Sequence, residues 1–245
     1  MTSPRFYCPA PIAPNQTMAL PADLAHHAIR VLRLASGTPV VLFDGRGGQY
    51  PARLVIDGKT GVAEIGARQE VEAELAGELI LVQGIVSGDK MDWIIEKAVE
   101  LGASRLVPVA ARRSVPLLKG ERLEKRRLRW ARIVQAASEQ CGRNRLMHID
   151  APRTLDDYLG EPGAPAPDQI LCCHPDADRA LSQTLAPTAR RIALLVGPEG
   201  GWSDDELAVA TAHQAQPVRF GTRVLRTETA GLALLTAVAT LKGWQ

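Results

Sequence analysis

Two short loops near the carboxyl end of the chain hold the residues best suited to binding a small ligand. The first loop, residues 197–201, reads Gly-Pro-Glu-Gly-Gly and follows the apolar run 192–196. The second loop, residues 221–230, follows residues 217–220 and contains two arginines, one glutamate and three threonines. The carboxyl ends of adjacent strands are the usual ligand site of an open α/β sheet. The two loops therefore predict a ligand pocket.

The sequence of the first loop excludes two common nucleotide sites. Backbone N–H groups of a glycine loop at a helix start could bind an anion or the polar edge of a nucleotide, and Ser203-x-x-Glu206 is a capping box that marks such a start. The loop is neither GxxxxGK[ST] nor GxGxxG, and no lysine lies near it. A tight structural turn is the alternative to a binding loop here.

The second loop places polar side chains directly before an entirely apolar helix. Arg223, Arg226 and Glu228 lie close together there, as is typical of a binding loop rather than of a simple surface turn. The alternative is a helix N-cap, at Thr227 or Thr229, with an accidental ion pair.

Basic residues are concentrated in one segment of a chain whose net charge is only +2. Residues 105–145 contain twelve basic and three acidic residues, and such a density of Lys and Arg favours a polyanion through counterion release. This predicts a contact with RNA or DNA, and a solvated helix face with salt bridges is the alternative. Arg30 and Arg33 share one face of a predicted helix and would fit the same kind of surface.

Composition predicts a cytoplasmic protein. The amino terminus has no apolar signal segment, and the longest apolar stretch, near residues 230–241, is too short to span a bilayer. The cysteines show no CxxC spacing and are expected to be reduced thiols, with no metal site at residues 172–174; they are Cys8, Cys141, Cys172 and Cys173.

The order of predicted elements divides the chain into two parts. Up to about residue 70 the pattern is β-like, with a hairpin of residues 39–43 and 49–56 around a glycine-rich turn and one helix near 21–34. Strands and helices then alternate, which predicts a mainly parallel sheet with helices on both faces. The predicted strands are 78–85, 105–110, 169–173, 191–196 and 217–220, and the predicted helices are 89–101, 121–141, 178–185, 203–213 and 228–241.

The pairing of Leu-Val-Gly-Pro-Glu-Gly-Gly-Trp-Ser at 195–203 with Leu-Arg-Thr-Glu-Thr-Ala at 225–230 resembles the ribosomal RNA small-subunit methyltransferase E family of the SPOUT superfamily. The resemblance spans nearly the whole chain. It also takes in residues 5–7, 26–33, 90–102, 113–114 and 129–143. Residues 9–15 are richer in proline than the family pattern, which affects only the local strand.

The resemblance implies an α/β fold with a SPOUT methyltransferase domain at 73–245, tied in a trefoil knot, and a smaller PUA-like β-barrel domain at 1–72 that helps to hold RNA. It implies methylation of N3 of a uridine in 16S ribosomal RNA of the small ribosomal subunit by a homodimer. S-adenosyl-L-methionine would bind in the knot, and neither a metal nor a membrane is expected.

The resemblance and the polar residues of the matched motifs also suggest roles for particular residues. Arg226 or Arg113 would stabilise the developing uridine anion, and Glu139 or Glu228 would accept the N3 proton. The expected cofactor-binding residues are Leu195, Gly197, Pro198, Glu199, Gly200, Gly221, Val224, Leu225, Arg226, Thr227, Thr229 and Ala230. The expected RNA-binding residues are Arg5, His27, Arg30, Arg33, Lys90, Arg113, Arg126, Arg129 and Arg143.

Two other functions fit the same sequence. One is a non-catalytic RNA-binding assembly factor, which the intact glycines and Arg-Thr-Glu-Thr at 226–229 disfavour. The other is a ribose 2′-O-methyltransferase of the same superfamily. A nucleotide-hydrolysing enzyme is disfavoured, because no metal-binding carboxylate and lysine accompany the loops.

Overall fold

A computed structural model of the protein describes residues 3–9, 11–57, 60–115, 119–161 and 166–244. The chain forms two compact units, Met1–Glu74 with Ser138–Leu146 and Leu75–Ala137 with Met147–Gln245. The first unit thus takes in residues 138–146, which the sequence-based division at residue 72 assigns to the other part. Hydrogen bonds explain why residues 138–146 belong to the first unit. The Arg5 side chain donates to Asn144 Oδ1 at 2.5 Å, and the Tyr7 backbone N–H donates to Glu139 Oε1 at 2.8 Å.

The first unit contains a mainly antiparallel sheet. Among the described residues its strands are ordered β1-β3-β4-β5-β2, with β1 and β3 parallel. The predicted hairpin is confirmed, since β3 and β4 pair with Val41 opposite Pro51, and Gly47 in the turn has a φ of +104° that favours glycine. The strands are β1 (Arg5–Tyr7), β2 (Thr17–Ala19), β3 (Pro39–Phe43), β4 (Tyr50–Asp57) and β5 (Thr60–Ile65).

The predicted helix of the first unit is present but not uniform. An α-helix, α1 (Ala22–His26), continues directly into a π-helical turn, η1 (His27–Val31). Pro21 occupies the N-cap, where its missing N–H costs no hydrogen bond. The helix buries Leu24, Ala25 and Ala28 in the core that the sheet covers, so its polar residues face outward.

The second unit is built on a parallel sheet. Among the described residues its strand order is β11-β9-β10-β6-β7-β8, and every pair is parallel, as the alternation of elements predicted. The strands are β6 (Glu78–Gly84), β7 (Arg105–Val109), β8 (His148–Ile149), β9 (Gln169–Cys173), β10 (Arg191–Val196) and β11 (Gln216–Val218). The helices are α2 (Lys90–Glu100), α3 (Glu121–Cys141), α4 (Leu155–Leu159), α5 (Leu181–Thr184), α6 (Asp204–Ala212) and α7 (Thr227–Leu241).

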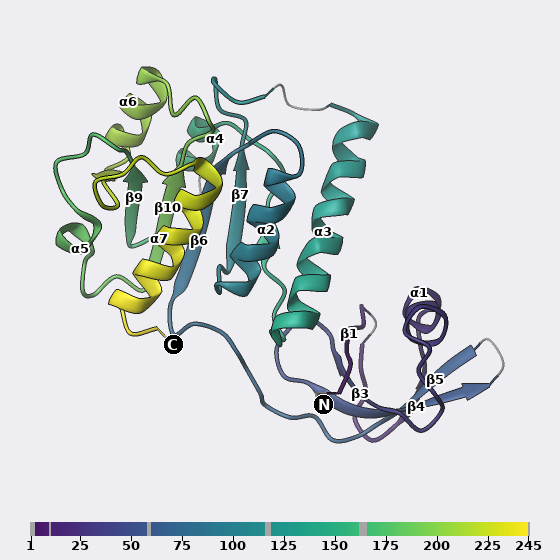
Figure 1. The fold of residues 1–245 in the computed structure, drawn as a ribbon. Coiled ribbons are helices and arrows are strands. Elements are labelled where there is room, and N and C mark those ends of the chain that lie inside the picture. The colour runs from purple at the N-terminus through teal and green to yellow at the C-terminus, as the bar shows by residue number, and fades with distance from the viewer. Residues whose placement is uncertain (1–2, 10, 58–59, 116–118, 162–165, 245) are drawn as a thin grey trace. The chain divides into compact units, whose positions relative to one another are not determined.

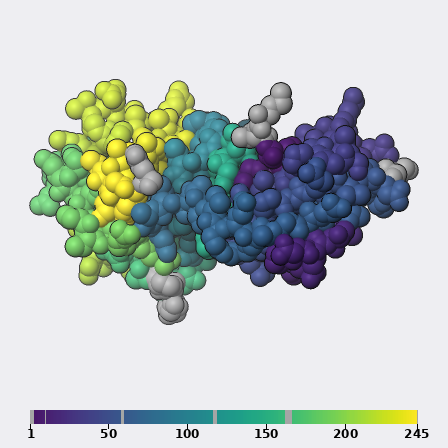
Figure 2. All heavy atoms as spheres, turned by 90° about the horizontal axis from the view of Figure 1, so that it is seen from below, coloured from purple at the N-terminus to yellow at the C-terminus, as the bar shows by residue number. Residues whose placement is uncertain are grey.

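Helices cover both faces of this sheet, as predicted. On one face Ile80 and Ala193 of the strands join Leu155 of α4 and Ala210 of α6 in one apolar cluster. On the other face α2 and α7 lie side by side against the sheet (Figure 1), with Gly231 of α7 close to the Leu81 side chain. Figure 2 shows the yellow residues of α7 reaching the surface beside the yellow-green residues that precede them.

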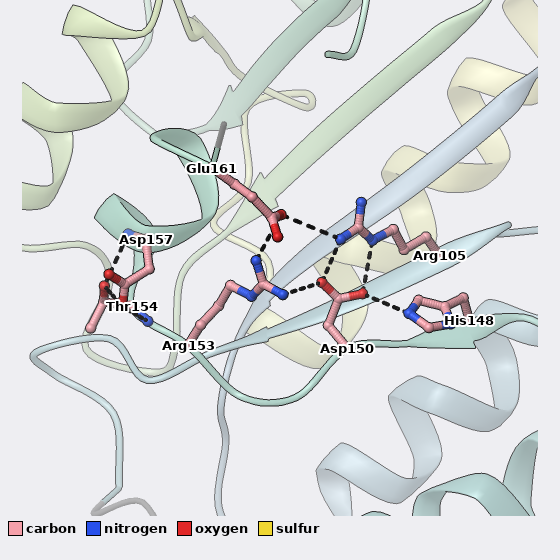
Figure 3. Close-up of polar contacts among 7 residues, drawn as sticks. All are labelled: Arg105, His148, Asp150, Arg153, Thr154, Asp157 and Glu161. Atoms are coloured by element: carbon pink, nitrogen blue, oxygen red, sulfur yellow. Dashed lines mark hydrogen bonds and ion pairs between the residues drawn. The ribbon is translucent and has the colours of Figure 1, made fainter. Parts of the chain in front are cut away.

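An ion-pair cluster joins the segment after β8 to the amino-terminal end of β7 (Figure 3). The Asp150 carboxylate, 1% exposed, accepts two hydrogen bonds from Arg105, at 2.8 and 2.6 Å, and lies 3.2 Å from the Arg153 guanidinium. His148 Nε2 is 3.3 Å from the same carboxylate, and Glu161 accepts from Arg153 at 2.8 Å. These ion pairs hold the chain between β8 and α4 against the amino-terminal end of β7.

No helix of the described chain has the length and apolar character needed to cross a membrane. The four cysteines form no disulfide with one another. Within the described ranges no group of His, Cys, Asp and Glu is arranged to hold a metal ion. Burial raises the pKa of Cys172 to about 12 and of Cys173 to about 11, so both remain protonated thiols near neutral pH.

Candidate functional site

The two glycine-bearing loops line one cavity of about 720 Å³ in the second unit. It lies at the carboxyl ends of β9, β10 and β11, which are the strand ends that the sequence pointed to. The size is that of a typical small-molecule site, about 300–1,000 Å³. Its lining comes from Lys90, Arg113, residues 173–176, residues 196–202, residues 219–228 and Ala230.

The first loop is fixed at both ends. At its start, Gly84 lets the loop approach β6 closely, since a Cβ at Gly84 would lie 2.5 Å from the ring and nitrogen of Pro198. At its end, the predicted capping box is confirmed: Ser203 N–H donates to Glu206 at 2.8 Å, and Glu206 N–H donates to Ser203 Oγ at 3.3 Å. The other Glu206 oxygen accepts from Arg112 N–H at 2.9 Å and so anchors α6 to the chain after β7.

Arg113 holds the first loop from the side. Its Nη1 donates to the carbonyl oxygens of Gly200, at 3.3 Å, and Trp202, at 3.1 Å. Trp202 is 5% exposed and packs in the apolar cluster under the loop. Arg113 therefore shapes the cavity wall through backbone contacts as well as contributing a positive charge to it.

Lys90, the first residue of α2, lies between two carboxylates at the cavity. Its Nζ is 3.5 Å from Glu199 Oε1 and 3.4 Å from Glu228 Oε1. Burial opposes ionisation of Glu199, but the backbone N–H groups of Glu199 and Ser87 and the Lys90 charge outweigh it and lower the pKa of Glu199. One wall of the cavity thus carries an ionised Glu199 carboxylate next to the Lys90 ammonium. The second oxygen of Glu228 is buried and has no hydrogen-bond partner among the described residues.

Arg226 is the N-cap residue of α7 and is exposed on the cavity wall. No hydrogen bond or ion pair of its side chain is found within the part of the chain that the structure describes. Its guanidinium is therefore available to a ligand, whereas that of Arg113 already holds two carbonyls.

Most, but not all, of the expected cofactor-binding residues line the cavity. Leu195 is fully buried in the sheet, where it packs with the cluster that includes Ala193. Thr229 lines a separate apolar groove on α2 and α7, with Trp93 and Phe220. The expected residues that do line it are Gly197, Pro198, Glu199, Gly200, Gly221, Val224, Leu225, Arg226, Thr227 and Ala230.

Glu139 is not part of this cavity. It belongs to the first unit, where its carboxylate accepts the Tyr7 N–H. Burial raises its pKa, and the Tyr7 hydrogen bond and the charges of His27 and Arg5 oppose that shift. The geometry within the described chain gives Glu139 a structural contact, while Glu228 and Arg226 are the polar groups on the cavity wall.

The expected RNA-binding residues fall into three groups. His27, Arg30 and Arg33 are exposed on and just after one short helix, as a phosphate-binding surface requires. Lys90 and Arg113 line the cavity. The remaining arginines are engaged: Arg5 with Gln49 and Asn144, Arg143 with Glu74, Arg129 with Asp92, and Arg126 over the Trp130 ring.

Sequence reasoning missed one wall of the cavity. Residues 173–176 line it because they follow β9 directly, and β9 lies beside β10 in the sheet. These residues also stand at the carboxyl end of a strand, but a short polar segment without glycine gave no signal of its own. Trp202, Arg219 and Phe220 also line the cavity, and all three stand next to residues that the sequence did single out.

Comparison with known proteins identifies the class of this fold. A model of the RNA methyltransferase domain matches residues 73–239, and a model of the RNA methyltransferase PUA domain matches residues 20–66. The chain is 33% identical to ribosomal RNA small subunit methyltransferase E of Synechocystis, over 94% of this chain and 76% of the relative. It is 29% identical to the protein of that name from Bacillus subtilis, over 91% and 90%.

Solved structures agree with the sequence matches. A ribosomal RNA small subunit methyltransferase E from Neisseria gonorrhoeae, bound to S-adenosyl methionine, is 35% identical, with a TM-score of 0.90 over 98% of both chains. A putative methyltransferase from Legionella pneumophila, also in complex with that cofactor, is 29% identical, with a TM-score of 0.91. The fold is thus that of an RNA methyltransferase with a PUA domain. The chain belongs to the ribosomal RNA small subunit methyltransferase E family.

Proposed function

We propose that this protein transfers a methyl group from S-adenosylmethionine to N3 of a uridine in 16S ribosomal RNA. The observation that carries the proposal is the single cavity built by both loops at the strand ends, in a chain of this family. Its Neisseria relative is described as bound to S-adenosyl methionine. Family membership supports ribosomal RNA of the small subunit as the substrate.

The residues present fit this cofactor. S-adenosylmethionine carries an adenine, a carboxylate, an ammonium and a sulfonium, so it needs apolar contact, backbone hydrogen bonds and charged groups of both signs. Val224 and Leu225 supply apolar side chains, and the loop at 197–201 supplies backbone groups. Glu199, whose lowered pKa keeps it ionised, supplies the negative charge. These residues would hold the cofactor, which supplies an activated methyl group on sulfur.

The chemical task left to the protein is to make uridine N3 nucleophilic. N3 must lose its proton, and its electron pair then forms the new bond to the methyl carbon as the carbon–sulfur bond breaks. The Arg226 guanidinium stabilises the negative charge that develops on the uracil ring, and Glu228 accepts the proton. Arg113 fixes the loop and adds positive charge. Since the base must reach a cavity, it is turned out of its stack.

Substitutions at the cavity test these roles. Arg226→Ala should lower the rate constant of methyl transfer about a hundredfold, the usual effect of removing one charge-stabilising donor, and leave the affinity for S-adenosylmethionine within about threefold, a difference below 1 kcal/mol. Glu228→Gln should lower the rate at neutral pH, because an amide accepts no proton. Arg179→Ala, which removes an exposed arginine of the same unit outside the cavity lining, is the matched control and should retain the wild-type rate.

Activity and cofactor affinity are measured on the same preparations, by methyl incorporation into 16S ribosomal RNA and by calorimetry. Glu139→Gln is included, and full activity there assigns the proton transfer away from Glu139. Full activity of both Arg226→Ala and Glu228→Gln would contradict the roles given to these residues.

We also propose that the protein acts in the cytoplasm as a homodimer and that its second unit is knotted. The exposed apolar groove on α2 and α7 supports a dimer, since Trp93 is 44% and Leu241 53% exposed. Light scattering should give twice the 26.4 kDa mass of the chain, and Leu241→Glu should shift it to the monomer. A monomeric wild type would contradict the dimer.

Two rival functions have distinct outcomes. A ribose 2′-O-methyltransferase would leave the label on the sugar of the isolated nucleoside. A non-catalytic assembly factor would bind RNA without binding S-adenosylmethionine, and calorimetry separates it from an enzyme. The carboxylates of Glu199 and Glu228 on the cavity wall offer partners for the cationic groups of S-adenosylmethionine, which supports an enzyme over a non-catalytic factor.

A further inference from the structure

One polar side chain is buried in the middle of the parallel sheet, directly behind the cavity loops. Gln83 is the penultimate residue of β6, which reads Glu-Leu-Ile-Leu-Val-Gln-Gly, and it is 0% exposed. β6 has neighbours on both sides, β10 and β7. Burying an amide there is costly unless it is hydrogen-bonded. The contacts of Gln83 therefore indicate what it is for.

Gln83 reaches across the sheet end to the second loop. Its Nε2 donates to the carbonyl oxygen of Gly84 at 3.0 Å and to the hydroxyl of Thr227 at 2.9 Å. Thr227 is 8% exposed, and its hydroxyl also contacts the carbonyl oxygen of Gly197. The side chains of Gln83 and Thr227 thus connect three distant positions of the chain. Residue 197 lies 114 residues after residue 83, and residue 227 lies 30 residues after residue 197.

The direction of each hydrogen bond follows from the acceptors. A carbonyl oxygen only accepts, so the atom of Gln83 facing Gly84 must be nitrogen. Thr227 Oγ1 then accepts from that nitrogen, and its own hydrogen goes to Gly197 O. The hydroxyl of Thr227 is therefore already used within the protein, and Thr227 contributes to a ligand site through the position of the two loops.

We propose that Gln83 is a positioning residue that holds both loops in the arrangement that binds the cofactor, acting through Thr227 on Gly197. This inference rests on the proposed function, because the proposed function assigns S-adenosylmethionine to the cavity. Gln83 itself does not line the cavity. It sets the distance between the first loop, at the end of β10, and the start of α7.

If Gln83 served only to stabilise the fold, its removal would lower the thermal midpoint and leave the affinity for the cofactor unchanged. Gln83 Oε1 is buried without a hydrogen-bond partner among the described residues, which destabilises the fold relative to an apolar side chain of similar size. Gln83→Leu should therefore leave the thermal midpoint near the wild-type value while it weakens cofactor binding. Weaker binding at unchanged stability is the mark of positioning.

The matched control is Gln169, another glutamine of the same sheet. It lies at the first position of β9, at the opposite end of the strands, and its amide binds Thr184 O at 2.8 Å and Gln216 at 2.6 Å. Gln169→Leu removes a buried amide that donates two hydrogen bonds, as Gln83 does, but lies far from the loops. It should change stability and leave cofactor affinity unchanged.

The test compares Gln83→Leu, Thr227→Val, the double variant, Thr227→Ser and Gln169→Leu by calorimetry with S-adenosylmethionine and by amide hydrogen exchange without it. Gln83→Leu and Thr227→Val should each weaken binding about tenfold, and the double variant should weaken it no further, because residues of one network are not additive. Thr227→Ser keeps the hydroxyl and should bind as the wild type does. Exchange at residues 199–202 and 229–232 should speed up in Gln83→Leu, in Thr227→Val and in the double variant, and stay unchanged in Gln169→Leu.

Wild-type affinity and wild-type exchange in Gln83→Leu would overturn the positioning role. A double variant whose affinity falls by the product of the two single effects would also overturn it, because the two residues would then act separately. If the wild-type protein binds no S-adenosylmethionine, the proposed function fails. The exchange measurement still decides whether Gln83 holds the loops.

Discussion

At the scale of single residues, the candidate site is defined by which of its side chains are ionised. The amide groups around Glu199 and the Lys90 charge keep the Glu199 carboxylate ionised, and Arg226 supplies a guanidinium to the same space. Cys173 also lines the cavity, but burial raises its pKa to about 11 and keeps it uncharged. The wall therefore suits a cationic ligand next to a developing anion.

The carboxyl of Glu139 gives a prediction about pH and stability. Burial raises its pKa in the folded protein, so it adds stability at pH values below the unfolded pKa and loses it as the pH rises through the folded pKa. Glu139→Gln keeps an acceptor for the Tyr7 N–H and removes the cost of burying a charge. We expect the variant to gain thermal stability relative to the wild type at pH 7 and to match it near pH 4.

Thermal unfolding of both proteins between pH 4 and pH 8 checks this. Tyr7→Phe, which keeps Glu139 and the backbone N–H that it accepts from, is the control, and its stability difference from the wild type should not change with pH. A stability difference that shrinks as the pH rises would show that the assigned direction of the pKa shift is wrong.

At the scale of elements, the long periodic segments were predictable, whereas three of the short paired strands were not. The amphipathic pattern of 121–141 gives the bounds of α3 as observed, and β9 and β10 match their apolar runs. β1, β2 and β8 have only three or two residues each and exist because distant strands pair with them, as Arg5 does with Val41. No local pattern encodes such pairing.

The same limit applies to the candidate site. Strand ends and glycines located both loops, because their signal is local. The contacts of Gln83 with Thr227 and of Arg113 with Trp202 join residues far apart in the sequence, and only the fold reveals them. Helix α7 begins at Thr227 rather than at residue 228, because Arg226 takes the N-cap position.

The ion-pair cluster of Figure 3 gives a prediction about stability. Asp150 is 1% exposed and faces the side chains of Arg105, Arg153 and His148. Asp150→Ala would leave the partly buried guanidinium of Arg105 with Glu161 alone among the described acidic residues, at 3.9 Å, and we expect the free energy of unfolding to fall by about 3 kcal/mol. Chemical denaturation measures it.

Asp156→Ala is the control for that decrease, since Asp156 is an exposed residue of the nearby helix α4. It should cost less than about 0.5 kcal/mol. Equal stability of wild type and Asp150→Ala would show that the cluster does not hold this segment in place.

At the scale of the whole molecule, the distribution of positive charge is what would bring an RNA to the cavity. The basic segment 105–145 gave the first indication of a polyanion, but the structure shows that several of its arginines already have acidic partners, such as Arg129 with Asp92. Arg30 and Arg33, in the other unit, are exposed. The PUA unit is therefore expected to carry much of the phosphate contact.

The salt dependence of RNA binding tests this division. Arg30→Glu should weaken binding to 16S ribosomal RNA and reduce the slope of log K against log salt by about 0.7–0.9 for each phosphate that the protein no longer neutralises. Arg179→Glu makes the same change in net charge at an exposed residue of the second unit. It should leave the slope near the wild-type value, and identical slopes for all three proteins would contradict the assigned surface.

The most direct test of the central claim is mass spectrometry of 16S ribosomal RNA nucleosides from a strain that lacks this protein. We predict that 3-methyluridine disappears in the deletion strain, returns when the wild-type chain is supplied, and does not return with Arg226→Ala. An unchanged 3-methyluridine signal in the deletion strain, or the disappearance of a ribose 2′-O-methyl nucleoside in its place, would contradict it.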